Sequence, residues 1–241
     1  MIISGEKMYS KPATEPADII VLHDTDSKDL NTFVKKGIVG CKLKTGCYSV
    51  TYTVDTDGSV RQHHDLKRRG IHAGKHVNPR SWGIEVQSQF NPSRGVPVGN
   101  QRLVEADWFP GGLAIMPSQE QLENTFKLVR GLVRQSKVPK KFPALRAQIY
   151  PWRPVFDGEK NLEPGIYAHA HLTTQRGDGH YPTVYTYFRF GGYSPREAYR
   201  LTEKAGMDAV AGVSLLPPPK TYMQALNTFW EVFMDSITGA V

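Results

Sequence analysis

The stretch that decides the fold is DIIVLHD, residues 18–24. It is apolar and rich in β-branched residues, which favours a strand buried within a sheet. His23 ends the apolar run. A lone histidine in that place is most often a hydrogen-bonded bystander, so its role depends on what the rest of the chain brings beside it.

A helix and a hairpin are predicted next along the chain. DSKDLNTFVKKG, residues 26–37, has the pattern of a helix with Asp26 or Ser27 as its N-cap and Gly37 as its stop. Residues 48–62 alternate apolar and polar positions around an Asp-Gly pair at 57–58, which predicts a β-hairpin. His63 and His64 follow directly and are expected in a solvated turn.

SWGIEVQSQ, residues 81–89, predicts a further strand. Because side chains alternate along a strand, Ile84 and Val86 share one face, and Glu85 lies on the other with Gly83 and Gln87. The clearest helix follows within residues 111–138. Ser118 and Gln121 resemble a capping box, and an apolar stripe runs along one face at Leu122, Phe126, Val129 and Val133. GIYAHAH, residues 165–171, predicts another strand, reached through a proline-rich loop at 151–164.

The character of the chain changes after residue 182. YSPREAYRLTEKAG predicts a helix with Ser194 as N-cap, Pro195 at its first position and Gly206 beyond its end. Residues 221–239 carry a broad apolar stripe, which we expect to pack back on the domain; a docking or self-association surface is the alternative. The sequence thus predicts an α/β fold with a central mixed sheet flanked by helices over residues 1–182, and a helical extension over 183–241.

Composition narrows the partner classes. The 241 residues carry a formal charge of +7, which favours an anionic partner such as nucleic acid or an acidic wall polymer. No apolar run approaches the ~18 residues of a membrane span, and the N-terminus lacks the apolar core of a secretory signal. Cys41 and Cys47 allow either a small disulfide loop or two free thiols.

Residues 165–182, GIYAHAHLTTQRGDGHYP, concentrate titratable side chains. His169, His171, Asp178 and His180 are all of the type that binds zinc, which usually takes three protein ligands and keeps a fourth position for water. On a strand, His169 and His171 would point to the same side. A further ligand must come from elsewhere, and His23 is of the right type.

Four segments, taken together, resemble one enzyme family. They are VLHDT with its histidine, the hairpin VDTDGSV, the segment IHAGKHVNPRSWGIEVQ, and YAHAHLTTQRGD after a long helix. In this order they resemble the zinc-dependent N-acetylmuramoyl-L-alanine amidases, a family that includes small phage lysozymes and the peptidoglycan-recognition proteins. The resemblance covers residues 18–182.

The resemblance implies a role for six residues. It implies that His23, His169 and Asp178 are the zinc ligands and that Glu85 is the general base. Arg176 corresponds to a cation beside the oxyanion, and His72 to a histidine that lines the substrate groove. Two departures leave alternatives open. The family's Asp-Pro-Gly is Asp-Gly-His here, so His180 competes with Asp178 as third ligand, and His171 is the fallback for His169.

The implied function is hydrolysis of the amide bond between N-acetylmuramic acid and L-alanine of peptidoglycan, with one zinc ion. A phage or prophage lysin released through holins or carried on a virion is expected, or else a cytosolic enzyme of wall recycling. The alternative is a non-catalytic peptidoglycan-binding protein, although the presence of Glu85 and Asp178 favours catalysis. No specific nucleic-acid partner is expected, because the sequence shows no binding motif and only the charge supports such binding, which would weaken steeply with salt.

Overall fold

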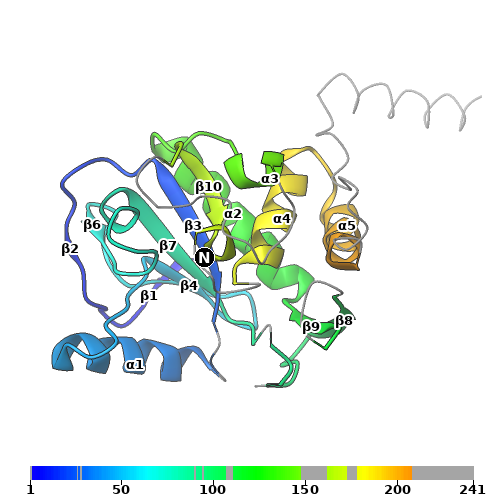
Figure 1. Ribbon diagram of the computed structural model, residues 1–241, viewed down its shortest axis with the longest axis horizontal. Helices are drawn as coiled ribbons and strands as arrows, with labels where there is room; N and C mark the ends of the chain where they lie inside the picture. Colours follow the sequence, from blue (N-terminus) through cyan, green and yellow to red (C-terminus); the bar gives the residue numbers. More distant parts are fainter. Residues whose placement is uncertain are drawn as a thin grey trace, which may run out of the picture.

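The computed structural model describes residues 2–25, 27, 29–89, 91–93, 95–106, 111–147, 162–172 and 178–207. A six-stranded sheet forms its centre, in the order β1-β5-β4-β7-β3-β10 (Figure 1). Neighbouring strands are parallel except for the β4–β5 pair, so the sheet is mixed as predicted. The strands are β1 (Ile2–Ser4), β3 (Ile19–Asp24), β4 (Tyr52–Val54), β5 (Val60–Gln62), β7 (Ser81–Val86) and β10 (Gly165–Ala168).

The predicted strand at 18–24 is confirmed as β3, and all six of its residues are buried. It lies between β7 and β10, with His23 opposite Glu85 in the register with β7. The predicted hairpin is confirmed as β4 and β5, joined across Gly58. Gly58 has φ +77°, a conformation that glycine adopts without strain.

Different elements pack on the two faces of the sheet. Ile20 and Leu22 of β3, with Ile84 and Val86 of β7, join the main core beneath α2 (Gln119–Gln135) and α4 (His180–Phe190). The alternate residues of β3 belong to the other face, where Ile19 and Val21 pack with Ala73 and Val77 from the loop before β7. By the same alternation, His23 of β3 and Glu85 of β7 lie on this second face.

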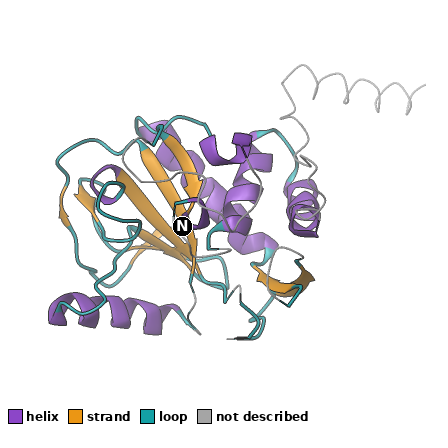
Figure 2. Cartoon of the chain, in the orientation of Figure 1, coloured by secondary structure: helices purple, strands orange, loops and turns teal. Residues whose placement is uncertain are grey.

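The described part of the chain has four helices of eight or more residues, three to one side of the sheet and one along its lower edge in the view of Figure 2. α1 (Leu30–Leu43) lies at the lower left of Figure 1, and α4 and α5 (Pro195–Met207) lie at the right. α2 carries the predicted capping box between Ser118 and Gln121. α4 packs on β3, β10 and α2, and α5 packs on α4. The boundary expected at 182/183 therefore falls inside a helix that belongs to the core of the domain.

The remaining regular elements are short. β2 (Lys11–Pro12) pairs with β6 (Arg68–Arg69), and β8 (Arg102–Glu105) pairs with β9 (Leu113–Met116). Within the described residues, α3 (Pro143–Ala147) and the 3-10 turns η1 (Asn78–Arg80) and η3 (His169–His171) are the other short elements. Among the described helices, none combines the length and the apolar character that crossing a bilayer requires.

The predicted bounds of the first helix are wrong at both ends. Its N-cap is Asp29, whose side chain accepts the N–H of Thr32 at 2.7 Å, rather than Asp26 or Ser27. Gly37 does not stop the helix: it lies inside α1, where an added Cβ would meet Tyr48 O at 2.8 Å. That glycine allows a close packing contact, and the helix ends instead at Leu43, with Lys44 as its C-cap at φ +56°.

The other expectations have different outcomes. Gly206 lies within α5 rather than beyond it. The turn residues His63 and His64 are buried, at 3% and 8% exposure. Cys41 and Cys47 form a disulfide. The predicted apolar helix at 221–239 and most of the proline-rich loop lie outside the described residues.

Candidate metal centre

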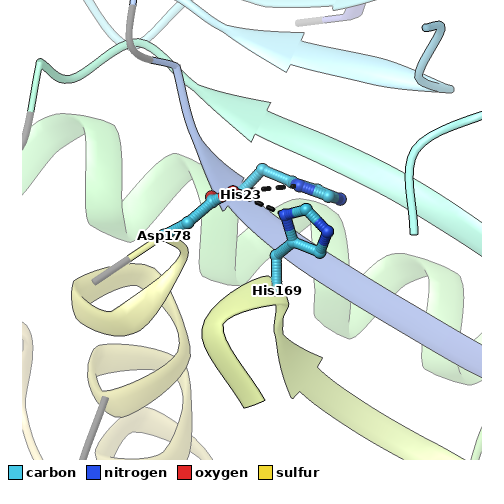
Figure 3. A group of neighbouring side chains, drawn as sticks. All are labelled: His23, His169 and Asp178. Carbon is cyan, nitrogen blue, oxygen red and sulfur yellow. Dashed lines mark hydrogen bonds and ion pairs between the residues drawn. The ribbon is translucent and has the colours of Figure 1, made fainter. Parts of the chain in front are cut away.

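Three side chains from three separate segments converge at the carboxyl ends of β3 and β10 (Figure 3). His23 stands near the end of β3, His169 begins the turn after β10, and Asp178 precedes α4. Their potential ligand atoms all lie within 4.8 Å of one another. All three residues are at most 7% exposed, so the group is enclosed by protein.

The atoms that face one another define a small triangle. Oδ2 of Asp178 lies 2.5 Å from Nδ1 of His169 and 3.7 Å from Nδ1 of His23. In a tetrahedral zinc site with ligand distances of about 2.0–2.1 Å, neighbouring ligand atoms stand about 3.4 Å apart. Two histidine nitrogens and one carboxylate oxygen are also the donor types that zinc prefers. The donor types of these residues, and the 3.7 Å between His23 and Asp178, therefore fit a zinc ion.

The electrostatics of the group favour a cation. Burial opposes ionisation of Asp178, but the neighbouring His169 and His23 hold its pKa below the ordinary value. Burial, followed by repulsion from His169, lowers the pKa of His23. A neutral His23 beside an ionised Asp178 matches the protonation states that metal binding requires of these two side chains.

The backbone around Asp24 fixes the orientation of Asp178. The N–H of Asp24 donates to Oδ1 of Asp178 at 2.8 Å, which leaves Oδ2 toward the histidines. In return, the N–H of Gly179 donates to Oδ2 of Asp24 at 3.0 Å. Gly179 has φ +76°, and an added Cβ would lie 1.8 Å from Leu22 O. Only glycine permits this close approach of α4 to β3.

Glu85 borders the same group from β7. Its Oε1 lies 3.9 Å from Nδ1 of His23, and its side chain is on the predicted face of the strand. Burial, with the negative charges of Asp178 and Asp24, raises the pKa of Glu85 well above its usual value. A carboxyl group of raised pKa beside a potential metal position is suited to accept and return a proton.

His72 also reaches this group, from the segment that precedes β7. Its Nδ1 lies 3.1 Å from Nε2 of His23, and its Nε2 lies 3.1 Å from Oγ of Ser81. Burial, then repulsion from the other histidines, lowers its pKa well below the ordinary value. His72 and His169 both line a cavity of about 710 Å³, whose other walls come from residues 11–12, 14, 47–48, 69–71, 74–75 and 78–79.

The two fallback ligands lie apart from the three-residue group. The chain leaves the sheet after Ala168 and turns into η3, so His169 and His171 do not alternate along a strand as expected. Nδ1 of His171 accepts the N–H of Ala168 at 3.3 Å instead. His180 begins α4 and is fully buried; burial and then the nearby His171 lower its pKa to about 3.

The structure adds three supporting residues to those predicted from the sequence, and one predicted residue lies outside the part of the chain that it describes. Asp24, Ser81 and Gly179 support the group through the contacts above. Each is adjacent or close to a predicted residue, but its role depends on contacts between distant segments. Arg176 lies outside the described residues, so its predicted role stays a prediction.

Comparison with known families gives one match over most of the chain. The family model described as N-acetylmuramoyl-L-alanine amidase matches residues 13–178. This range includes His23, Glu85, His169 and Asp178. No curated protein matches the sequence significantly.

Solved structures that are similar to this chain include an amidase, a hydrolase and a peptidoglycan recognition protein. The N-acetylmuramoyl-L-alanine amidase LysC from Clostridium intestinale is 15% identical, with 74% of this chain and 87% of that chain covered and a TM-score of 0.45. The Staphylococcus aureus hydrolase AmiA, in complex with its ligand, is 14% identical, with 88% and 86% covered and a TM-score of 0.46. Drosophila peptidoglycan recognition protein SA is 13% identical, with 73% and 85% covered and a TM-score of 0.44.

Proposed function

Because the chain belongs to the N-acetylmuramoyl-L-alanine amidase family, we propose that it is a zinc-dependent hydrolase of the amide bond between N-acetylmuramic acid and L-alanine in peptidoglycan. One observation carries the proposal. His23, His169 and Asp178 form a compact set of zinc-type ligands, and the carboxylate of Glu85 stands beside it.

In this proposal the three ligands bind the metal ion, and the cavity binds the substrate. His23, His169 and Asp178 would hold the ion through two imidazole nitrogens and one carboxylate oxygen. A bound zinc ion supplies Lewis acidity, which polarises an amide carbonyl and lowers the pKa of a coordinated water to about 7. The cavity beside His169 offers room for the sugar and peptide on either side of the scissile bond.

Glu85 is the proposed general base and acid. Its carboxylate accepts a proton from the attacking water and returns that proton to the amine of L-alanine as the amide bond breaks. Its environment suits the return step, because burial, with the nearby carboxylates of Asp178 and Asp24, raises its pKa and favours the protonated form. Arg176 is the proposed cation beside the oxyanion of the tetrahedral intermediate. As a guanidinium it stabilises negative charge but does not deprotonate.

The place of action is part of the proposal. The charge of +7 suits adhesion to an anionic bacterial wall. We propose a phage or prophage lysin that reaches the wall through holin-type release or on a virion. A cytosolic enzyme that recycles wall fragments would use the same site chemistry, and the size of the preferred substrate distinguishes the two.

A defined substrate tests this function. Soluble N-acetylmuramoyl-peptides and intact sacculi are incubated with zinc-loaded protein, and products are identified by mass spectrometry. Release of peptides with a free L-alanine amino terminus supports the amidase. Preferential cleavage of sacculi supports the lysin, and preferential cleavage of soluble fragments supports the recycling enzyme. Binding to sacculi with no cleavage of either substrate would contradict the proposal in favour of a non-catalytic recognition protein.

A further inference from the structure

We propose that His72 is a positioning residue for the metal ligand His23, and that the segment from 72 to 83 is built to hold its ring. The inference rests on the metal site of the proposed function. It assigns a role to a histidine that the sequence suggested only as part of a substrate groove.

The first step concerns the proton on His23. Its Nδ1 faces Asp178 and the metal position, at 3.7 Å from Oδ2. A histidine that binds a metal through Nδ1 carries its proton on Nε2 and donates it to an outer partner. That partner here is Nδ1 of His72, at 3.1 Å.

The second step fixes the proton on His72. Since Nδ1 of His72 accepts from His23, the ring of neutral His72 must carry its proton on Nε2. This Nε2–H donates a hydrogen bond to Oγ of Ser81, at 3.1 Å. The three side chains form a directed chain of hydrogen bonds from the ligand to the start of β7. The chain fixes the tautomer and the rotation of the His23 ring.

The third step is the support of His72 itself. Oδ1 of Asn78 accepts the backbone N–H of His72 at 3.0 Å and that of Ala73 at 2.8 Å, which anchors the loop. Strand β7 passes directly beneath the ring at Gly83, where an added Cβ would lie 2.8 Å from Cγ of His72. The rings of His72 and His23 meet edge to face, with centroids 5.2 Å apart.

Three spaced residues of IHAGKHVNPRSWG thus support the ring of His72: Asn78, Ser81 and Gly83. Asn78 anchors the loop, Ser81 accepts a hydrogen bond from the ring, and Gly83 leaves space beneath it. Outer partners of this kind typically change metal affinity by 10–100-fold when they are removed.

Zinc affinity measured by competition with a chromogenic chelator tests the proposal without an activity assay. His72→Ala removes the acceptor, and we expect the zinc dissociation constant to rise about 10–100-fold. His72→Asn places an amide oxygen near the former position of Nδ1, and we expect it to restore most of the affinity. Ser81→Ala should weaken zinc binding less than His72→Ala, because it removes only the outer bond. His76→Ala, on the same loop, is the control and should leave the affinity unchanged.

The outcomes separate positioning from groove contact and from folding. Circular dichroism and thermal unfolding of the metal-free variants establish that each is folded. Unchanged zinc affinity in folded His72→Ala, with only KM raised, would overturn the inference, as would a wild-type protein that binds no zinc. The cobalt-substituted protein adds a second readout, because its visible spectrum should shift in His72→Ala and return in His72→Asn. Zinc binding that depends on His72 without any peptide release would sustain this inference and contradict the amidase.

Discussion

His23 and Glu85 are direct register partners on the adjacent parallel strands β3 and β7. Nδ1 of His23 lies 3.9 Å from Oε1 of Glu85, on the face of the sheet that α2 and α4 leave free. A ligand-type nitrogen and a carboxylate are thereby held together by rigid backbone rather than by loops. This arrangement suits catalysis, because the reacting groups need no reorganisation when substrate enters.

The first prediction separates chemistry from metal binding at Glu85. Glu85→Gln keeps the shape of the side chain but removes its ability to accept a proton. We expect the rate of peptide release to fall by 10²–10⁴-fold, the usual contribution of general acid–base catalysis. Zinc affinity and binding to sacculi should stay near wild type. An active Glu85→Gln variant would show that another group moves the proton.

The second prediction concerns the identity of the third ligand. Asp178→Ala removes the oxygen that faces both histidines, so we expect zinc affinity to be lost. His180→Gln and His171→Gln should retain it, because neither residue joins the group of three. Equilibrium dialysis with metal analysis distinguishes the variants. Retained zinc in Asp178→Ala, with loss in a folded His180→Gln, would assign the ligand to His180.

The parts of the site that the sequence could predict are those set by local pattern. The apolar run before His23 predicts a buried strand, and alternation along 81–89 assigns Glu85 to the open face. Helix α4 was missed because its Thr183, Val184 and Thr186 are β-branched and Pro182 suggests a break. Proline is tolerated in the first turn of a helix, and burial on nearly every side overrides the low propensity.

Contacts between distant segments were beyond a reading of the sequence. His23 and His72 are separated by 49 positions, and their hydrogen bond depends on the loop before β7 crossing the end of β3. The turn of η3 likewise depends on tertiary contacts: the N–H of Ala170 donates to the carbonyl of Asp178 at 2.8 Å. A strand pattern over 165–171 gives no sign of that bond.

The third prediction tests the junction between β3 and α4. Gly179→Ala forces a side chain into a left-handed conformation, at about 1–2 kcal/mol, and against Leu22 O. We expect the free energy of unfolding to fall by at least about 2 kcal/mol. Gly131→Ala is the matched control, because it lies within α2 with open space around it, and it should raise stability by about 0.5–1 kcal/mol. Urea unfolding of the two metal-free variants measures both effects. Equal effects would contradict the close approach.

The fourth prediction concerns pH and His64. Burial lowers the pKa of His64 to about 4, and its Nε2 has no hydrogen-bond partner among the described residues. Above pH 6.5 the side chain is largely neutral in both the folded and the unfolded state, so its titration does not change the free energy of unfolding. As pH falls from 6.5 toward 4, the unfolded chain takes up the proton and the folded state does not. The free energy of unfolding therefore falls by on the order of 2 kcal/mol by pH 4.5.

Urea unfolding of metal-free protein between pH 7.5 and 4.5 measures this loss. His64→Gln cannot titrate, so the decline in its unfolding free energy should be smaller than that of wild type by about the same 2 kcal/mol. Parallel declines for the two proteins would show that His64 titrates normally in the fold.

The most direct test of the central claim is mass spectrometry of purified bacterial sacculi incubated with the protein, before chelation, after chelation and after zinc is restored. The account predicts free stem peptides that begin at L-alanine, lost with the chelator and regained with zinc. Release of such peptides that is insensitive to chelation, or none at all from zinc-loaded protein, would contradict it.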